Sequence, residues 1–365
     1  MPVLVVNSGS SSLKYQVVDT DSGESLVAGL IERVEDHSEA FAEMVMQLRA
    51  SGVEPKAVGH RVVHGGEKFS APAPIDASVI AAIEELIPLA PLHNPGNLAG
   101  IRGALAAFPG LPQVAVFDTA FHQTMEPSSY LYAIDRKLSE TFGIRRYGFH
   151  GTSHSYVSKA AAKFLGKEKF TGIVLHLGNG GSACAVKDGK SENTSMGLTP
   201  LQGLVMGTRS GDIDPAIVMY LARVANMSLD EIDSSLNKDA GLKGLTGHSD
   251  LRDVQELASK GDKNAIEALE VYALRAKQYV GSYLAQLGEI DAIVFTAGVG
   301  ENSSEMRAQI CSGLEHLGIV LDGEKNSARQ KGERDISATD SKIKVLVIPT
   351  NEELEIALQT SAQLN

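Results

Sequence analysis

Short apolar runs separated by glycine-rich polar segments dominate the beginning of the chain. The runs Val3 to Val6 and Leu13 to Val18 flank the polar segment Asn7 to Ser12. Extended apolar runs on both sides of a short Gly/Ser segment predict a β-hairpin. A flexible Ser-rich linker is the alternative, and the strongly β-forming flanks disfavour it.

The same pattern returns near the middle of the chain. Ile173 to Leu177 is apolar, Gly178 to Ser182 is rich in glycine, and Ala183 to Val186 is apolar again. Because the two patterns lie roughly half a chain apart, they indicate two related domains that each open with a hairpin.

Elsewhere strand-like and helix-like patterns alternate, which favours an α/β fold with mixed sheets. Strands are predicted at Val114 to Phe117, Ala292 to Phe295 and Lys344 to Ile348. One helix is predicted to start at Asp214-Pro215 and to run to Val224, and a capping box formed by residues Ser228 to Glu231 predicts the start of another. Three/four apolar spacing predicts a long helix over Asp262 to Leu287, and a last helix is predicted after Glu352.

Length, charge and cysteine content narrow the class of protein. A chain of 365 residues is long enough for two domains. The formal net charge of −12 argues against nucleic acid or an anionic membrane as the main partner. The two cysteines are too few for a disulfide framework or a zinc set. With neither a membrane-spanning apolar stretch nor a signal peptide in this sequence, we expect a cytoplasmic protein.

Three glycine-bearing segments follow or join predicted strands, at Asn7 to Ser12, Gly178 to Ser182 and Gly298 to Ser303. Turns with several free backbone amides bind anions, so three of them indicate a nucleotide site, although tight turns alone are the alternative. The chain has neither a GxxxxGK[ST] loop nor an early GxGxxG, which argues against a P-loop or dinucleotide-binding enzyme.

Two arginines and two carboxylates occupy positions suited to phosphate chemistry. Arg61 and Arg209 lie in glycine-flanked polar segments, and guanidinium groups pair with carboxylates and phosphates; solvated surface arginines are the alternative. Asp118 and Glu352 follow predicted strands, where carboxylates could help hold Mg²⁺. Glu352 could equally be an acid favoured by a helix N-terminus.

Histidines occur in two pairs with four-residue spacing, His60 with His64 and His150 with His154. Such spacing on a helix can bind zinc, but neither pair forms HExxH, and Gly151 disfavours a helix across the second pair. His150 and His176 fit better as hydrogen-bond donors to phosphoryl oxygens.

These segments together resemble the acetate and propionate kinase family. The matching motifs run in family order from residue 3 to 357: VLVVNSGSSSLKY, HRVVHGGEKF, PLHNPGN, FDTAFHQT, RRYGFHGTSH, HLGNGGS, MGTRSGDIDP, HSDLRDV, FTAGVGENS and PTNEELEIA. The region between Val18 and His60 is shorter than in the family pattern, but no family motif is lost by this shortening.

The resemblance implies an actin-like ATPase fold, with two ribonuclease H-like domains of mixed sheets flanked by helices and a cleft between them. Residues 1–120 and 353–365 would form the first domain, to which the C-terminal helix returns, and 121–352 the second. The second domain would carry the nucleotide site and the interface of a homodimer.

The resemblance also implies a role for individual residues. Arg61, Asp118, His150 and Arg209 would be catalytic, and Val63, Leu92, Phe149 and Pro200, with Arg61, would hold the acid. Mg²⁺ or Mn²⁺ would lie at Asn7 and Glu352. The nucleotide would contact Asn7, Lys14, His176, Gly178, Asn179, Gly180, Asp250, Arg252, Gly298, Gly300 and Asn302.

The implied reaction is reversible, Mg²⁺-dependent transfer of the ATP γ-phosphoryl group to acetate, giving acetyl phosphate and ADP. A carboxylate is already ionised at neutral pH, so the difficulty is to bring two anions together, which arginines, a histidine and Mg²⁺ address. Two alternatives stay open: a propionate kinase of the same family, and a non-catalytic actin-like protein that uses ATP as a switch.

Overall fold

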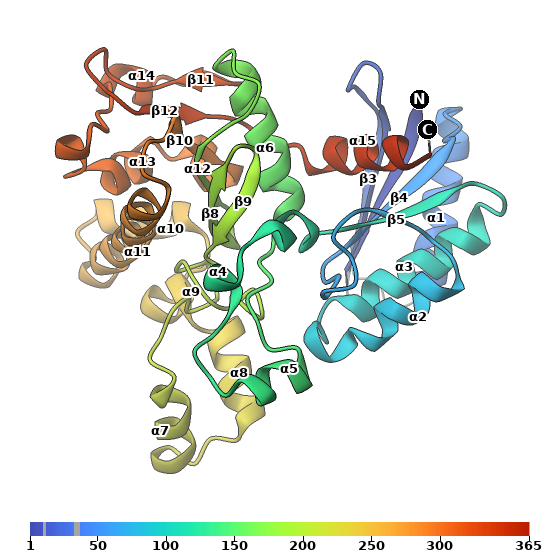
Figure 1. The fold of residues 1–365 in the computed structure, drawn as a ribbon, viewed down its shortest axis with the longest axis horizontal. Helices are drawn as coiled ribbons and strands as arrows, with labels where there is room; N and C mark the ends of the chain where they lie inside the picture. Colours follow the sequence, from blue (N-terminus) through green and yellow to red (C-terminus); the bar gives the residue numbers. More distant parts are fainter. Residues whose placement is uncertain (10–11, 33–36, 365) are drawn as a thin grey trace. The chain divides into compact units, whose positions relative to one another are not determined.

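The computed structural model describes residues 1–9, 12–32 and 37–364 and forms two compact units. The first unit contains Met1–Gln123, Phe149–Tyr156 and Asn351–Asn365, and the second contains Thr124–Gly148 and Val157–Thr350. Figure 1 shows the sheet and helices of each unit. Within the described residues, no helix is both long and apolar enough to cross a membrane.

The first unit is built on a six-stranded mixed sheet with the order β3-β2-β1-β4-β6-β5. Its strands are β1 (Pro2–Ser8), β2 (Ser12–Asp19), β3 (Ser25–Glu32), β4 (Ala57–Val62), β5 (Ala73–Pro74) and β6 (Gln113–Phe117). Its helices are α1 (His37–Ser51), α2 (Ala77–Glu85), α3 (Asn94–Ala107) and α15 (Glu352–Leu364), with 3₁₀ turns at Ile87–Leu89 and Ala120–Thr124.

Alternation along β1 explains how this sheet is covered. Leu4 and Val6 pack in a core with Phe41 and Met44 of α1, whereas Val3 and its neighbours on the opposite face pack against α15. Successive side chains of a strand point to opposite faces, so a fully apolar strand needs helices on both sides. The predicted C-terminal helix therefore belongs to the first unit.

The second unit is also built on a six-stranded sheet, with the order β11-β12-β10-β7-β8-β9. Its strands are β7 (Gly172–Leu177), β8 (Gly181–Lys187), β9 (Lys190–Thr194), β10 (Ala292–Thr296), β11 (Arg334–Asp335) and β12 (Lys344–Val347). Its helices are α4 (Pro127–Tyr130), α5 (Arg136–Phe142), α7 (Ala216–Val224), α8 (Leu229–Lys238), α9 (Gly241–Thr246), α10 (Leu251–Ser259), α11 (Lys263–Leu287), α12 (Ala297–Asn302), α13 (Ser304–Cys311) and α14 (Gly323–Ser327), with a 3₁₀ turn at Glu315–Leu317. Helix α6 (Gly151–Phe164) begins in the first unit and ends in the second.

The two sheets share one topology. In each, the first strand pairs antiparallel with the second and parallel with the fourth, which are β2 and β4 for β1 and β8 and β10 for β7. The edge strands β5 and β11 are antiparallel to their neighbours in both sheets. The two hairpins predicted from the apolar runs are therefore confirmed as the opening of two related sheets, although Ser10 and Ser11 of the first turn lie outside the described residues.

Most predicted elements are present, and two predictions about glycines are wrong. The Ser228–Glu231 capping box and the Asp262 cap of α11 are both formed. However, Gly298 to Ser303 is not a turn, because most of it belongs to helix α12. Gly151 does not prevent a helix either, since it is the first residue of α6. Glycine is needed at this position because a side chain would meet the Asp118 carbonyl oxygen at 2.1 Å.

Candidate active site

An arginine–aspartate pair forms the centre of the candidate site in the first unit. Arg61 lies in β4 and Asp118 follows β6, and these two strands are parallel neighbours. Arg61 Nε donates to Asp118 Oδ1 at 3.0 Å and Nη2 donates to Oδ2 at 2.6 Å. Arg61 Nη1 lies 3.4 Å from Asn7 Oδ1 at the end of β1. The carboxyl ends of three strands thus bring together three of the predicted site residues.

Burial and charge fix the ionisation of this pair. The Asp118 carboxylate is only 1% exposed, and burial raises its pKa, an effect that Arg61 offsets only in part. Burial alone would lower the pKa of Arg61, but Asp118 and then Glu352 outweigh it and hold that pKa above its usual range. The Arg61 guanidinium is therefore charged at any physiological pH and is held in one orientation by a bidentate pair. Glu352, at the start of α15, is close enough to influence both groups.

The loop before α6 carries the predicted histidine. Gly151 N donates to the Asp118 carbonyl oxygen at 2.9 Å, which ties the start of α6 to the end of β6. His150, the preceding residue, has a positive φ of 57°, a strained conformation for a residue with a side chain. His122 Nε2 lies 3.0 Å from the Phe149 carbonyl oxygen on the other side. The hydrogen bond from Gly151 places His150, which precedes it, close to the backbone of Asp118.

The remaining predicted residues of the first unit differ in exposure. Val63 and Phe149 are buried, whereas Leu92 is 54% exposed. The backbone N–H of Val63 donates to Asn97 Oδ1 at 3.0 Å, and Asn97 Nδ2 donates to the Ser8 carbonyl oxygen at 2.8 Å. Lys14 of β2 forms an ion pair with Glu353. Asn97 thus links the end of β1 to the segment after β4.

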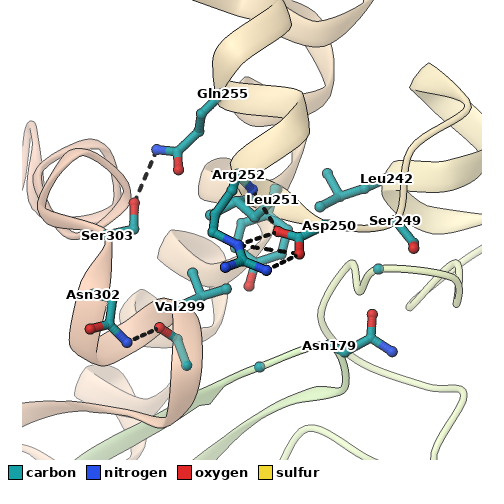
Figure 2. A pocket seen from close by; sticks show the side chains of 14 residues that line it. Asn179, Leu242, Ser249, Asp250, Leu251, Arg252, Gln255, Val299, Asn302 and Ser303 are labelled. Atoms are coloured by element: carbon teal, nitrogen blue, oxygen red, sulfur yellow. Dashed lines mark hydrogen bonds and ion pairs between the residues drawn. The ribbon is translucent and has the colours of Figure 1, made fainter.

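A pocket of about 590 Å³ marks the candidate site of the second unit. Figure 2 shows side chains that line it, including Asn179, Asp250, Arg252, Val299 and Asn302. The complete lining is Gly178, Asn179, Gly207, Leu242, Ser249, Asp250, Leu251, Arg252, Gln255, Tyr272, Gly298, Val299, Asn302 and Ser303. The pocket brings together six residues that the sequence predicts for nucleotide contact: Gly178, Asn179, Asp250, Arg252, Gly298 and Asn302.

One side of the pocket is an ion pair at the start of α10. Asp250 caps this helix by accepting from Arg252 N at 2.9 Å, and Arg252 Nε donates to the same carboxylate at 3.0 Å. Hydrogen bonds from Arg252 lower the pKa of Asp250 to about 2. The Arg252 side chain is 87% exposed, so the pair lies at the solvent side of the pocket.

The glycine-rich turn after β7 supplies another part of the lining. Gly178 N donates to the Gly180 carbonyl oxygen at 3.0 Å, and Gly207 N donates to the Asn179 carbonyl oxygen at 3.0 Å. A side chain at Gly207 would meet the Ser249 carbonyl oxygen at 2.7 Å, so glycine is required for this close approach. His176 is buried at the end of β7. Gly180 lies in this turn and Gly300 is buried in α12, and neither is among the residues that line the pocket.

Arg209 differs from Arg61 in its partners. Its Nη1 donates to the Pro200 carbonyl oxygen at 3.3 Å and lies 3.8 Å from Met206 Sδ. Burial lowers its pKa, and among the described residues no carboxylate pairs with it. A partly buried cation with only neutral partners is suited to an anionic ligand.

Sequence reasoning missed several residues of both units. In the first, His93 is close enough to influence the charge of Asp118, and its position in the PLHNPGN motif was the available signal. In the second, Leu242, Ser249, Gln255, Tyr272 and Ser303 line the pocket. Apolar residues such as Leu242 and Tyr272 cannot be told from ordinary core residues without the fold.

Comparison with known proteins identifies the family. The family model described as "Acetokinase family" matches residues 2–47 and 33–358. An acetate kinase from Leifsonia xyli subsp. xyli is 55% identical, with 98% of this chain and 97% of the relative covered. The chain belongs to the acetokinase family. An acetokinase relative named acetate kinase from Helicobacter acinonychis is 49% identical over 100% of this chain and 99% of its own length.

Solved acetokinase structures agree over the whole chain. Porphyromonas gingivalis acetate kinase has a TM-score of 0.95 at 41% identity, with 100% of both chains covered. A propionate kinase from Francisella tularensis has a TM-score of 0.95 at 45% identity, with 99% of both covered. A ROK hexokinase from Thermus thermophilus, at 12% identity and a TM-score of 0.50, is similar in fold alone. The chain therefore has the actin-like ATPase fold.

The comparisons also bear on the short region after β2. The alignment with the Leifsonia relative spans 386 positions, whereas this chain has 365 residues. The chain matches the acetokinase model in two separate segments, which overlap at residues 33–47. This break falls inside the region, between Val18 and His60, that the sequence shows to be shorter than the family pattern.

Proposed function

We propose that this chain is an acetate kinase, which transfers the γ-phosphoryl group of ATP to acetate and yields acetyl phosphate and ADP. An acetate oxygen forms the new bond to phosphorus, the bond from phosphorus to the ADP oxygen breaks, and ADP leaves with the electron pair. The observation that carries the proposal is the 55% identity to an acetate kinase over nearly the full length of both chains.

The two arginines answer the central difficulty of this reaction. Acetate and ATP are both anions, and acetate needs no general base because it is ionised at neutral pH. Arg61, fixed by Asp118, holds the acetate carboxylate and the transferring phosphoryl group in one orientation. Arg209, whose hydrogen bonds with the described residues go to neutral groups, adds positive charge for the phosphoryl group. His150 donates to the same group in the transition state.

The pocket of the second unit is the proposed ATP site. Leu242 and Val299 supply apolar walls for the adenosine, and Asp250, Arg252 and Asn302 supply polar groups. The turn from Gly178 to Gly180 supplies backbone amides for the phosphates, with His176 beside it. Lys14 of the first hairpin is a further phosphate contact, which it makes by exchanging its partner Glu353 for phosphate.

Magnesium fits the oxygen donors of the first unit. The described residues contain no group of three or more histidine, cysteine or acidic side chains that could hold a metal. Mg²⁺ does not require one, because it binds through one or two carboxylates, water and substrate phosphates. Arg61 occupies both oxygens of Asp118, so Glu352 and Asn7 are the residues that would hold Mg²⁺, or Mn²⁺. The ion would neutralise phosphate charge during transfer.

The acceptor pocket is proposed to select a very small acid. Val63 and Phe149 are buried near the end of β4 and before α6, and Leu92 and Pro200 complete the proposed apolar wall. One methylene in such a pocket changes binding by only ~1–3 kcal/mol. Propionate is the second candidate acceptor, because a propionate kinase is 45% identical to this chain.

A homodimer is the proposed assembly, with helix α7 in the interface. None of the residues of α7 is buried. Its exposed apolar side chains are Ile217, Met219, Tyr220 and Val224, and Leu229 follows at the start of α8. Three of them, at positions 217, 220 and 224, follow helical spacing and share one face. An apolar helical face of this kind is suited to self-association.

A hydroxylamine trap tests the function directly. The protein would be incubated with ATP, Mg²⁺ and either acetate or propionate, and hydroxylamine would convert any acyl phosphate to a coloured hydroxamate. An acetate kinase gives acetyl hydroxamate with kcat/KM higher for acetate than for propionate. An actin-like ATP switch would bind or hydrolyse ATP without forming hydroxamate, and that result would reject the proposal.

A further inference from the structure

Helix α12 forms one wall of the pocket but is too short to be stable alone. It has six residues, Ala297–Asn302, whereas isolated helices shorter than about 12 residues are marginal in water. It begins at Ala297, whose φ of 63° is positive, a conformation that costs a non-glycine residue about 1 kcal/mol or more. Its residues Gly298, Val299 and Asn302 line the pocket, and Figure 2 shows the side chains of Val299 and Asn302. Contacts from outside the helix must therefore hold this wall.

Arg307 of α13 makes these contacts. Its Nη1 donates to the Gly300 carbonyl oxygen at 2.9 Å and to the Glu301 carbonyl oxygen at 3.0 Å. Its Nε and Nη2 donate to the side-chain and backbone oxygens of Asn326, both at 2.8 Å. One planar guanidinium thus joins the last turn of α12 to α14. Carbonyl oxygens at the end of a helix have no partner within it, so these hydrogen bonds cap α12.

The environment of Arg307 is unusual for a structural arginine. The residue is only 2% exposed, and the four hydrogen bonds that it forms with described residues all go to neutral oxygens. Burial, followed by the nearby Arg334, lowers its pKa to about 10. Burying a cation without an anionic partner is costly. The helix that this cation caps carries three pocket residues, which gives the costly arrangement a functional reason.

Arg334 supports the same helix from β11. Its Nη2 donates to the Glu301 carbonyl oxygen at 2.9 Å, so two guanidinium groups share one acceptor at the end of α12. Asn302 Nδ2 closes the helix from inside by donating to the Gly298 carbonyl oxygen at 2.8 Å. Arg307 supplies the larger part of this clamp, because it holds two carbonyl groups of α12 and Arg334 holds one.

We propose that Arg307 is a positioning residue for ATP, which sets nucleotide affinity by holding α12 in its place in the pocket wall without touching the nucleotide. The inference rests on the proposed function only in taking this pocket as the ATP site. It assigns no part in phosphoryl transfer to Arg307, so the variants should change binding of ATP and leave the chemical step intact.

Arg307→Lys tests the clamp with the positive charge kept. One lysine ammonium cannot span Asn326 and the two carbonyl groups of α12 as a planar guanidinium does. We expect the KM for ATP, and its Kd measured by calorimetry without acetate, to rise about tenfold, which corresponds to ~1.4 kcal/mol. The kcat and the KM for acetate should stay within about threefold of wild type, since neither depends on the nucleotide wall.

Arg146→Lys is the matched control. Arg146 also lies in the second unit, and its Nη1 donates to three backbone carbonyl groups, those of Thr194, Ser195 and Met196, at 2.7, 3.0 and 3.1 Å. None of these residues lines the pocket. The control should leave the Kd for ATP unchanged even if it lowers the melting temperature. Equal effects of both variants on Kd would mean that loss of stability alone is responsible, and this would overturn the proposal.

Arg334→Lys keeps the test decisive if Arg307→Lys does not fold. It removes one hydrogen bond to α12, so we expect a smaller rise in Kd, of about two- to fourfold. A wild-type Kd for ATP in every clamp variant that folds would overturn the inference. Wild-type protein that binds no ATP would instead contradict the proposed function, so the two failures are distinguishable.

Discussion

The two proposed catalytic arginines differ in the groups that hold their side chains. Both oxygens of the buried Asp118 accept hydrogen bonds from Arg61, so that guanidinium is oriented before any ligand arrives. Among the described residues, the hydrogen bonds of the Arg209 side chain go to the Pro200 carbonyl oxygen and the sulfur of Met206. A fixed cation can position an acceptor, and a cation without a carboxylate partner has its full charge available for an incoming anion.

Replacing Arg209 with alanine should therefore affect chemistry more than stability. We expect turnover with ATP and acetate to fall at least ~10²-fold, scaled down from the 10³–10⁵ that arginine fingers contribute. The circular dichroism spectrum should stay that of wild type, because Arg209 forms no ion pair with any described carboxylate that the substitution would break. Arg102→Ala, which removes an exposed arginine paired with Glu84, is the control and should keep normal turnover. Near-normal turnover of Arg209→Ala would remove it from the reaction.

Glu352 gives a second prediction at this scale. If it is a Mg²⁺ ligand, Glu352→Ala should raise the Mg²⁺ concentration needed for half-maximal rate by roughly tenfold or more, since one of few protein oxygen ligands is lost. The neighbouring Glu353, which pairs with Lys14, offers the matched variant Glu353→Ala, with a smaller shift. A Mg²⁺ titration of each variant at saturating ATP measures this. An unshifted curve for Glu352→Ala would show that it serves only as an acid in the first turn of α15.

Residue types could be predicted from the sequence, but their partners could not. Small neighbours and polar motifs marked Arg61, Arg209 and Asp118 as candidates. Nothing local indicates that Arg61 pairs with Asp118, 57 positions away, because the pair exists only once β4 and β6 lie side by side. The same holds for Lys14 and Glu353, which are 339 positions apart.

At the scale of elements, apolar periodicity was enough to predict a helix that is stabilised by residues within its own sequence. Helix α11 begins after its Asp262 cap and runs to Leu287, close to the predicted Asp262 to Leu287, because capping and a repeating apolar face lie within its own sequence. Helix α12 was expected to be a turn because it contains two glycines. It is helical because Arg307 and Arg334 cap it from other elements, and such tertiary contacts override local propensity.

The pairing of β4 with β6 makes stability depend on pH. His60 of β4 is buried, with its Nε2 2.8 Å from Gln113 Oε1 of β6. Burial lowers the pKa of His60 to about 4, from 6.5 when unperturbed. The unfolded chain therefore binds a proton between these pH values that the folded protein does not bind. The free energy of unfolding from this group is fully present above pH 6.5 and is lost as the pH falls toward 4.

Urea unfolding of wild type and His60→Gln at two pH values checks this prediction. Between about pH 7 and about pH 5 the wild type should lose roughly 2 kcal/mol more than the variant, following linkage for one buried histidine. Glutamine keeps a hydrogen-bonding side chain but does not titrate. His248→Gln, which changes an exposed histidine, is the control and should keep the pH dependence of wild type. Parallel losses in wild type and His60→Gln would mean that His60 is protonated in the folded protein.

At the scale of the whole molecule, only part of the topology that the two sheets share could be predicted from the sequence. The two hairpins could be recognised because each is contiguous, with β1 beside β2 and β7 beside β8. The parallel partners β4 and β10 could not be matched, because strands β8 and β9 and helices α7 to α11 lie between β7 and β10 in the chain. Strand order depends on long-range contacts, so the shared topology of the two sheets could be recognised only from the fold.

The apolar face of α7 leads to the last prediction, which concerns assembly. A large exposed tyrosine beside Ile217 and Val224 is costly to leave in water, and a second copy of the chain would bury it. We expect wild type to behave as a dimer in light scattering coupled to size exclusion, and Tyr220→Glu, at a position 61% exposed, to shift it to monomer. Leu30→Glu places the same charge on a 57% exposed leucine of the first unit and should stay dimeric. If Tyr220→Glu also stays dimeric while its melting temperature is unchanged, α7 is not in the interface, and another surface of the second unit must be sought.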